Sequence, residues 1–591
     1  MCLAGQEVTD IRVRPGGKWV SGVILEPGLD GLVTRLCMWS VANRDVVVDI
    51  LLDPMPQAPR GLSGGVHCWD LEGKRVFVST AKQGIVEVAL TGDVASFSRP
   101  LAFDPTRNWT TPAIDFTQST VYAIADWQEM WKCNLGGGEP ELMYRANGFA
   151  IDATAGADGM CMTWDRPHMP WTQSTIYPEP AMLEVSMQQP RFSTQGNSFG
   201  YISDATGYAN VVISADQIVS EDVTIQDDCE HGGPTWGPGQ RTWCFNSDGT
   251  KVAYTRNEKG FGTLWVYDRI TQQRTQIDRG IYGCLSWEHN TLGALRSGAR
   301  TPTQAVTYEM SPQKFGARTI IVQPGAKQWL TPQYEEELVE PSLHEAINGN
   351  VVVPYRLYRA KNPNYGLIVW VHGGPVDQWQ VTFRPKFSYW LSRGWSIAVV
   401  DHRGTTGYGR VFQQQLEGNW GKYDSSDTVA VVQQVQRAFG FRAERTILMG
   451  SSAGGLSVLN ALGQSRTLVA GAVISFPVVD LSDLMQGSDP FETHYMPRLI
   501  GAKDASDSML VKRSPLSRAD VIAGTPLLIF HGDQDTSVPI SHSEQLRDLV
   551  NAAGGAVRLE VMHGQGHGFR DPAHIIYEYS LTEEFLNELM R

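Results

Sequence analysis

Long apolar runs are missing from this sequence of 591 residues: no stretch approaches the roughly 18 residues that a membrane-spanning helix requires. Clusters of lysine and arginine are missing too, and the formal net charge is -14. Because nucleic-acid binding depends on grouped basic side chains, this charge argues against a nucleic-acid partner. The first residues have neither the basic start nor the apolar stretch of a signal peptide. We therefore expect a soluble, cytoplasmic protein without a membrane partner.

Cysteine is scarce and unevenly placed. All eight cysteines lie in the first half of the chain, widely spaced and without a Cys-x-x-Cys pair. Cysteine-based metal sites need such close pairs, so the sequence predicts no metal and no cofactor. Buried thiols in a reducing compartment are the simpler interpretation. A cysteine nucleophile is also excluded from the second half.

Short alternating strands fill the chain from about residue 8 to about residue 312, separated by glycine, aspartate, asparagine and proline. Segments of this kind begin near residues 11, 62, 112, 148, 189, 233 and 280. Their spacing of about 40 residues is the period of a four-stranded propeller blade. The recurrence favours a β-propeller, seven-bladed to within one blade because the repeats are degenerate, over a pair of β-sandwiches.

The pattern changes after a predicted linker at residues 313–335. Residues 335–339 and 351–358 predict a hairpin. Apolar strands then alternate with helices near 384–393, 425–439, 453–464, 541–553 and 573–590. This alternation predicts a mostly parallel sheet covered on both faces, with an active site at the carboxyl ends of its strands. We therefore divide the chain into a propeller domain over 1–312 and an α/β domain over 336–591.

A Gly-x-Ser-x-Gly motif occupies residues 450–454, between an apolar strand-like run and a helix-like run. This strand, turn and helix pattern predicts a nucleophile elbow, in which the tight reversal strains the backbone of Ser452 and exposes its hydroxyl. The register of the motif selects Ser452 over Ser451. Because the motif also occurs in ordinary turns, the prediction depends on partners elsewhere in the chain.

A candidate acid follows the predicted strand at 526–530. The loop after this strand reads His-Gly-Asp-Gln-Asp at 531–535 and contains two aspartates. We assign Asp535 as the acid, with Asp533 as its rival. Asp533 directly follows the turn glycine and is better placed to cap loop amides.

Candidate bases follow the predicted strand at 557–562. His567 lies between two glycines and is our choice, with His563 as its rival. The spacing of this pair resembles that of metal ligands, but the intervening glycines disfavour the helix that would bring both side chains to one face. His542 and His574 begin predicted helices, and we expect them to be exposed to solvent.

An oxyanion hole requires about two hydrogen-bond donors aimed at the reacting oxygen. The N-H of Ala453 is one candidate. The second is expected from the His-Gly-Gly-Pro loop at 372–375, which follows the predicted strand at 366–371. An ordinary Gly-Pro turn is the alternative for this tetrapeptide taken alone.

These motifs resemble the prolyl oligopeptidase family of serine peptidases, in particular its acylaminoacyl peptidases and related aminopeptidases. The resemblance covers about residues 335–591. It rests on HGGP at 372–375, DHRGTTGYG at 401–409, GNWG at 418–421, GSSAGG at 450–455, HGDQDTSVP at 531–539 and GHGF at 566–569.

The resemblance implies a β-propeller that caps an α/β-hydrolase catalytic domain and admits short peptides. It implies Ser452 as nucleophile, Asp535 as triad acid and His567 as base. The N-H groups of Ala453 and Gly374 would form the oxyanion hole. His372 stands where the dipeptidyl peptidase branch has an oxyanion-binding tyrosine, so we expect a side-chain donor to be absent or replaced.

The expected substrates are short peptides, cleaved in the acylaminoacyl-peptidase, aminopeptidase or oligopeptidase manner. Val478, Val479 and Leu484 are candidates for an apolar pocket that holds the residue before the cut, although a role in the core is at least as consistent with their character. Two alternatives are hydrolysis of a small-molecule amide or ester, and a catalytically silent propeller scaffold. A homo-oligomer is compatible with the sequence.

Overall fold

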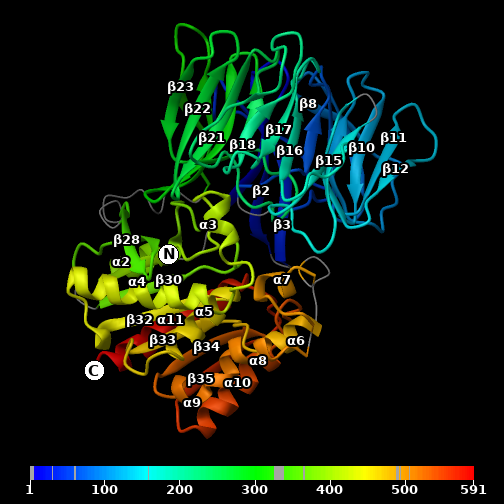
Figure 1. Cartoon of the computed structure of the whole chain (residues 1–591). Helices are drawn as coiled ribbons and strands as arrows, with labels where there is room; N and C mark the ends of the chain where they lie inside the picture. The colour runs from blue at the N-terminus through cyan, green and yellow to red at the C-terminus, as the bar shows by residue number, and fades with distance from the viewer. Residues whose placement is uncertain are drawn as a thin grey trace.

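The computed structural model describes residues 6–28, 31–58, 62–156, 159–324, 338–363, 366–486, 492, 494–504 and 506–591. Two domains lie one against the other (Figure 1). The N-terminal domain is built of β-strands, drawn in blue to green, and the C-terminal domain combines strands with helices, drawn in green to red. Among the described helices, none has both the length and the apolar character needed to cross a bilayer.

Seven small antiparallel sheets form the N-terminal domain, each from strands that are consecutive in the chain. The first three are β1 (Glu7–Val13), β2 (Trp19–Gly28), β3 (Gly31–Ser40) and β4 (Val47–Leu51); β5 (His67–Trp69), β6 (Arg75–Ser79), β7 (Ile85–Thr91) and β8 (Val94–Pro100); and β9 (Trp109–Ile114), β10 (Thr120–Ala125), β11 (Glu129–Asn134) and β12 (Glu141–Arg145). The fourth is β13 (Phe149–Thr154), β14 (Met160–Trp164) and β15 (Thr175–Tyr177).

The remaining three sheets follow the same order. They are β16 (Met187–Phe192), β17 (Phe199–Ser203), β18 (Asn210–Ile213) and β19 (Val223–Thr224); β20 (Trp243–Phe245), β21 (Lys251–Glu258), β22 (Phe261–Asp268) and β23 (Arg274–Arg279); and β24 (Ile281–Glu288), β25 (Thr291–Gly298), β26 (Thr301–Glu309) and β27 (Ala317–Val322). The predicted seven-bladed β-propeller is confirmed.

Apolar packing closes the ring, because among the described strands none is exchanged between the first and last sheets. Ile11 and Val13 of β1 share a buried cluster with Cys284 and Leu295 of the seventh sheet. Strand β27 lies inside the segment 313–335 that the sequence predicts as a linker. It pairs with β26, so the last sheet ends at Val322, and residues 325–337 lie outside the described part of the chain.

The axis of the propeller is closed by two glycine loops. Gly64 donates its N-H to the carbonyl of Gly239 at 3.0 Å, and Gly65 accepts the N-H of Thr111 at 2.8 Å. A Cβ atom built on Gly239 would lie 2.1 Å from the Gly64 oxygen. Gly64 precedes the second sheet and Gly239 the sixth, which are not neighbours in a ring of seven. The two loops therefore meet across the axis, where only glycine fits.

Each sheet also contributes at least one residue with positive φ, in its first strand or within four residues before it, among them Asp10, Gly65, Thr111, Asp152, Gln189, Gly239 and Cys284. The first of these, Asp10, is fully buried and receives hydrogen bonds from Arg241 at 2.9 Å and His67 at 3.0 Å. Although burial favours its neutral form, these partners hold the pKa of Asp10 well below its usual value. A ring of bent strands thus surrounds the closed axis.

An eight-stranded sheet organises the C-terminal domain, in the order β28-β29-β31-β30-β32-β33-β34-β35. From β30 onward the strand pairs are parallel, whereas β28 and β29 are antiparallel. The strands are β28 (Ser342–Asn348), β29 (Val351–Tyr358), β30 (Gly366–Val371), β31 (Trp395–Val400), β32 (Thr446–Ser451), β33 (Gly471–Ser475), β34 (Leu527–Gly532) and β35 (Val557–Met562).

Helices cover both faces of this sheet (Figure 1). Leu367 and Val369 of β30 enter one buried cluster, while Ile368 and Trp370 enter the other, as the period of two in a strand requires. The helices are α2 (Pro385–Ser392), α3 (Arg410–Gln414), α4 (Tyr423–Phe439), α5 (Ala453–Leu462), α6 (Leu481–Gln486), α7 (Met496–Ile500), α8 (Ser508–Arg513), α9 (Ala519–Ile522), α10 (Ser541–Ala552) and α11 (Pro572–Leu589), with short 3-10 turns η2 (Ala443–Arg445) and η3 (Pro515–Arg518).

The predicted hairpin is wrong in its first strand. Residues 342–348, not 335–339, pair with β29. Residues 335–337 lie outside the described part, and Leu338 and Val339 belong to no strand. The short helices α3 and α6 to α9 were not predicted, because segments of four to six residues give no readable helical period.

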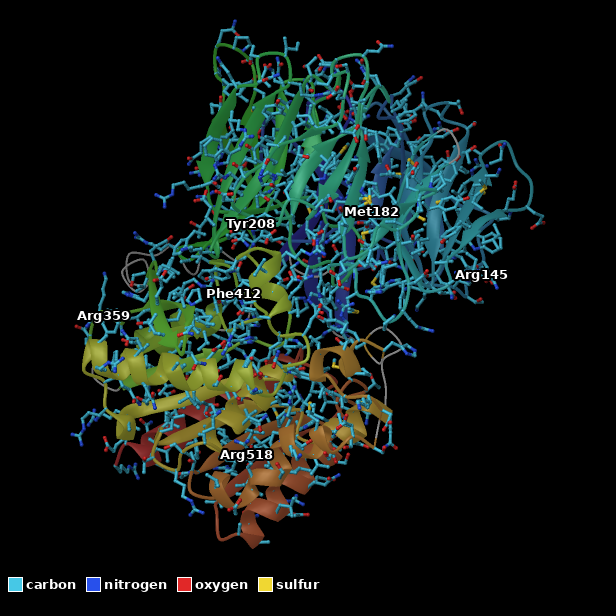
Figure 2. The ribbon with its side chains drawn as sticks, in the orientation of Figure 1. Arg145, Met182, Tyr208, Arg359, Phe412 and Arg518 are labelled. Carbon is cyan, nitrogen blue, oxygen red and sulfur yellow. The ribbon has the colours of Figure 1, made fainter. Side chains whose placement is uncertain are left out.

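The domains meet through backbone and side-chain hydrogen bonds next to α3. Arg410 donates its N-H to the Gly207 carbonyl at 2.8 Å, and Gly409 donates to the Glu230 carboxylate at 3.1 Å. A Cβ atom built on Gly409 would lie 2.9 Å from the ring of Tyr208. Figure 2 shows Tyr208 and Phe412 at this junction.

Candidate active site

Ser452 lies at a sharp turn between β32 and α5. Its φ of 55° and ψ of -126° are strained for any residue other than glycine. A Cβ atom built on Gly450 would lie 2.5 Å from the Gly454 carbonyl oxygen, and one built on Gly454 would lie 2.5 Å from that of Val371. The glycines are therefore required by close backbone contacts. This geometry is that of a nucleophile elbow.

Two residues from distant loops form a chain of hydrogen bonds that starts at the Ser452 hydroxyl. His567 Nε2 lies 3.0 Å from Ser452 Oγ, and His567 Nδ1 lies 2.7 Å from Asp535 Oδ2. The other Asp535 oxygen accepts the N-H groups of Ser537 and Val538, each at 2.9 Å. Burial alone would raise the pKa of Asp535, but these hydrogen bonds lower it below its usual value. An ionised Asp535 would orient the His567 ring with Nε2 free to accept the serine proton.

The rival acid and base form a separate pair. His563 Nδ1 lies 2.9 Å from Asp533 Oδ2, and Gly564 donates its N-H to Asp533 Oδ1 at 2.7 Å. The His563 side chain is 81% exposed. Asp533 thus caps its loop, as an aspartate after a turn glycine is expected to do. Of the two histidines, only His567 is hydrogen-bonded to the Ser452 hydroxyl, and its partner acid is Asp535.

Backbone N-H groups flank the serine. Ala453 is the first residue of α5, so no carbonyl one turn earlier in the helix receives its N-H. A Cβ atom built on Gly373 would lie 3.6 Å from Ser452 Cβ, which brings the loop 372–375 beside the serine. Gly374 follows with φ +122°, in a region open to glycine.

The His372 side chain is not part of this donor set. Its ring is fully buried, with Nε2 at 2.8 Å from Thr405 Oγ1 and Nδ1 at 2.7 Å from the Gly373 carbonyl. It stacks on His402 at 4.6 Å between ring centroids. Burial, with the neighbouring His402, holds the pKa of His372 well below its usual value. His372 therefore supports the loop from beneath and offers no side-chain donor to an oxyanion.

The three predicted pocket residues are buried. Val478 and Leu484 pack in an apolar cluster with Trp171 and Tyr495, while Val479 enters the core beside the sheet. Their exposures of 3%, 7% and 0% are those of core residues. The interpretation as core therefore describes their surroundings better than that of an open pocket.

Aromatic residues of the propeller reach the same cluster, which the sequence did not indicate. Trp171 lies 4.4 Å from Trp236 and 5.9 Å from Tyr495 between ring centroids. Trp236 donates its indole N-H to the Val376 carbonyl at 2.9 Å, just beyond the loop 372–375. Long loops give no period from which such a contact between domains could be predicted.

His542 was predicted to be exposed, and this is wrong. The residue is fully buried, with Nε2 at 3.0 Å from Asp483 Oδ2 and Nδ1 accepting the Val479 N-H at 3.1 Å. The ring thus joins α10 to α6 and to the residues just before it. His574 is partly exposed, with 29% of its side chain accessible.

A cavity of about 1060 Å³ lies between the domains. Leu62, Gly65 and Trp236 of the propeller line one side, and Asp377 and Thr406 of the hydrolase domain line another. The candidate triad does not line it. The wall on the hydrolase side continues directly from the loop that flanks Ser452.

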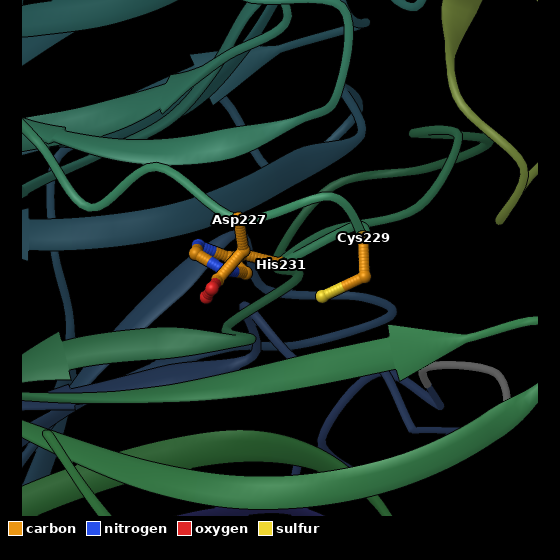
Figure 3. Close-up of side chains that lie close together, drawn as sticks. All are labelled: Asp227, Cys229 and His231. Atoms are coloured by element: carbon orange, nitrogen blue, oxygen red, sulfur yellow. The ribbon is translucent and has the colours of Figure 1, made fainter.

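Asp227, Cys229 and His231 form a group whose possible ligand atoms lie within 4.8 Å of one another (Figure 3). His231 Nε2 lies 2.9 Å from Asp227, and Nδ1 accepts the Val211 N-H at 3.1 Å. The Arg256 guanidinium lies 3.2 Å from Cys229 Sγ. Both ring nitrogens are engaged and a cation contacts the thiol, so this group is poorly suited to bind a metal ion.

Fold and site together define an α/β-hydrolase capped by a seven-bladed propeller, with a serine, a histidine and an aspartate in hydrogen-bonded sequence. Residues 381–591 match the model of the prolyl oligopeptidase family. The C-terminal domain of this chain is therefore similar to the catalytic domains of that family.

Curated relatives match the C-terminal part. The chain is 29% identical over 230 residues to dipeptidyl aminopeptidase BIII of Pseudoxanthomonas mexicana, covering 38% of this chain and 33% of that protein. It is 27% identical over 204 residues to the acylamino-acid-releasing enzyme of Mus musculus, covering 33% and 27%. The matched segment thus spans about a third of the length of these relatives.

Solved structures match the whole chain. A puromycin-hydrolyzing peptidase of Mycobacterium tuberculosis superposes with a TM-score of 0.86 at 20% identity, covering 100% of this chain and 95% of that one. The acylaminoacyl peptidase of Pyrococcus horikoshii gives 0.74 at 17% identity, covering 99% and 96%. At these identities the likeness is one of fold.

Proposed function

We propose that the protein is a serine peptidase of the prolyl oligopeptidase type that hydrolyses short peptides through an acyl-enzyme on Ser452. The observation that carries this proposal is the chain of hydrogen bonds from Ser452 through His567 to Asp535, at 3.0 Å and 2.7 Å. The match of the C-terminal domain to the model of the prolyl oligopeptidase family supports it.

In the first step Ser452 Oγ attacks the scissile carbonyl carbon while His567 Nε2 takes the hydroxyl proton. The negative charge that develops on the carbonyl oxygen is stabilised by the N-H groups of Ala453 and Gly374. The C-N bond then breaks, and His567 returns the proton to the leaving amine. Water attacks the ester with His567 again as base, which frees the acid product and Ser452. Asp535 keeps the His567 ring oriented and stabilises its positive charge.

The proposed cleavage type is that of an acylaminoacyl peptidase, an aminopeptidase or an oligopeptidase. A second candidate is hydrolysis of a small-molecule amide or ester, favoured by the full-length likeness to a protein named as puromycin-hydrolyzing. Aminoacyl anilides, N-acetyl-aminoacyl anilides, nitrophenyl esters and puromycin separate these candidates when their kcat/KM values are compared. Turnover of esters alone would contradict the peptidase proposal.

The identity of the nucleophile is tested by labelling with a fluorophosphonate. We expect the label on the wild-type protein and on Ser451→Ala, and none on Ser452→Ala. Peptide mapping of the label locates the modified residue. Equal labelling of Ser452→Ala would place the reactive residue elsewhere and remove the basis of the proposal, whereas an unlabelled wild-type protein would favour a silent scaffold.

The remaining expectations are predictions from the sequence. They are a cytoplasmic location, no nucleic-acid or membrane partner, and compatibility with a homo-oligomer. The charge of -14 supports the expectation about nucleic acids.

A further inference from the structure

Three arginines line the cavity between the domains, and two of them are neutralised within the protein. Arg241 forms an ion pair with Asp10 at 2.9 Å, and Arg256 forms one with Glu258 at 3.2 Å. For Arg384, no ion pair or hydrogen bond of the guanidinium occurs among the described residues, and its buried Nε has no hydrogen-bond partner. Arg384 is therefore the cationic side chain of this wall that lacks a protein anion.

Aromatic rings hold the Arg384 guanidinium in place. It lies 4.6 Å from the centre of the Trp379 ring and 6.0 Å from that of Phe387. Such stacking orients the planar group and leaves its edge free for hydrogen bonds. Burial lowers the pKa of Arg384 only to about 10, so the side chain stays charged at neutral pH.

Asp377 is the acid that lines the same wall, and it does not pair with Arg384 within 4.0 Å. Burial raises the pKa of Asp377 to about 6, although Arg384 acts to lower it. With this pKa of about 6 the carboxyl is mostly ionised at neutral pH, but among the described residues no ion pair joins it to the Arg384 guanidinium. The binding edge of Arg384 remains available to an anion from outside.

The wall that carries Arg384 begins at the candidate oxyanion loop. A Cβ atom built on Gly374 would lie 3.1 Å from Asp377 Cβ, and Gly373 lies beside Ser452. A cavity of about 1060 Å³ has room for a short peptide. A substrate bound at Ser452 can therefore extend along this wall.

We propose that Arg384 binds the terminal carboxylate of short peptide substrates and so makes the site select peptides with a free C-terminus. A guanidinium meets a carboxylate with two parallel hydrogen bonds, a geometry that an amide cannot reproduce. The proposal deepens the proposed function and rests on it for the cleavage step. A carboxylate on a substrate side chain offers the same chemistry, so the test must separate the two sources.

The test measures binding and cleavage separately. Binding of tetra-alanine to Ser452→Ala is measured by calorimetry with the peptide as free acid, as C-terminal amide, and as an amide with one alanine replaced by aspartate. Each is prepared with a free and with an acetylated amino terminus. The same peptides are given to the enzyme with intact Ser452 to obtain kcat/KM. Arg384→Gln, Arg384→Lys and the control Arg256→Gln are compared in both backgrounds.

We expect the free acid to bind about tenfold or more tightly than the amide, the range of a charge-assisted hydrogen-bonded pair. In Arg384→Gln this ratio falls to about one, Arg384→Lys restores part of it, and Arg256→Gln keeps it. Equal affinity for acid and amide, or loss of the ratio in Arg256→Gln, would overturn the proposal. So would undetectable binding of all peptides, and a preference for the aspartate peptide over the free acid would assign Arg384 to side chains instead. If the ratio is present but no peptide is cleaved, the anchor stands and the proposed peptidase activity does not.

Discussion

The two domains of this protein use their strands in opposite ways. In the hydrolase domain, apolar strands buried on both faces end in short motifs, so that Ser452 follows its strand directly. In the propeller, each sheet is built of strands that are consecutive in the chain. Side chains that contact the other domain, such as that of Trp171, come from long loops. The residues of the candidate triad are thus encoded locally in one domain, while contacts that shape the cavity depend on distant parts of the chain.

The reacting groups give the strongest test of local encoding. We expect His567→Ala to lower kcat/KM by about 10⁴-fold or more, because serine then has no base. His563→Ala, which removes the other histidine of the same loop, is the control and should retain most activity. Steady-state kinetics on an anilide substrate gives both values. The reverse order would assign the base to His563.

The two aspartates extend the same test. Asp535→Asn is expected to lower kcat by about 10³- to 10⁴-fold, since the His567 ring loses its acceptor and takes the wrong tautomer. Asp533→Asn should leave kcat nearly unchanged, because its partner His563 does not contact Ser452. Equal losses in both variants, with intact folding by circular dichroism, would contradict the pairing.

The glycines on the propeller axis test structure rather than chemistry. Gly239→Ala places a methyl group 2.1 Å from the Gly64 oxygen at a φ of +82°, and we expect it to lower the free energy of unfolding by about 2–4 kcal/mol. Gly92→Ala is the matched control, because its φ is +63° and nothing lies within 4 Å of the added atom.

Denaturant titration gives the free energy of unfolding of both glycine variants. The control should lose about 1 kcal/mol from backbone strain alone. A Gly239→Ala variant as stable as this control would mean that the loops do not touch across the axis in solution.

The smallest expected effect is a pH dependence of stability that arises from Glu230, where the two domains meet. Burial raises the pKa of Glu230 to about 7 from an ordinary value of 4.5, although N-H groups of Ala209 and Gly409 act to lower it. The folded protein therefore holds a proton that the unfolded chain releases, and stability falls as pH rises from about 4.5 to 7.

We expect the free energy of unfolding of the wild type to fall by on the order of 2 kcal/mol between acidic and neutral pH because of the Glu230 carboxyl. Glu230→Gln cannot titrate and should lack this part of the loss, whereas Glu544→Gln, on an exposed site, should behave as the wild type. The free energy of unfolding of the three proteins is measured by denaturant titration across this pH range. Parallel profiles for all three proteins would show that Glu230 is ionised throughout.

The propeller and the triad geometry could be anticipated from sequence for different reasons. Repetition makes the blade count readable, since segments about 40 residues long return seven times. The positions of Ser452, Asp535 and His567 follow from strand ends, which a parallel sheet brings to one edge. The structure brings these three residues together, and their catalytic roles remain proposals.

Other features depend on contacts that no local pattern records. His542 is buried because its ring forms hydrogen bonds with Asp483 and Val479, about sixty residues earlier in the chain. Arg384 shows no motif, and its place in the cavity wall follows from the loop after β30 and from the facing propeller. The meeting of Gly64 with Gly239 joins segments far apart in sequence.

That meeting has a consequence for how substrates arrive. With backbone atoms in hydrogen-bond contact across its axis, the described part of the propeller is a wall and provides no tunnel for a polypeptide. We therefore expect peptides to enter along the margin where the domains touch, near the bonds from Gly409 and Arg410 to the propeller. On such a route, we expect the opening of the hydrogen bonds at that margin, and not the diameter of a pore, to limit the length and bulk of the substrates that reach Ser452.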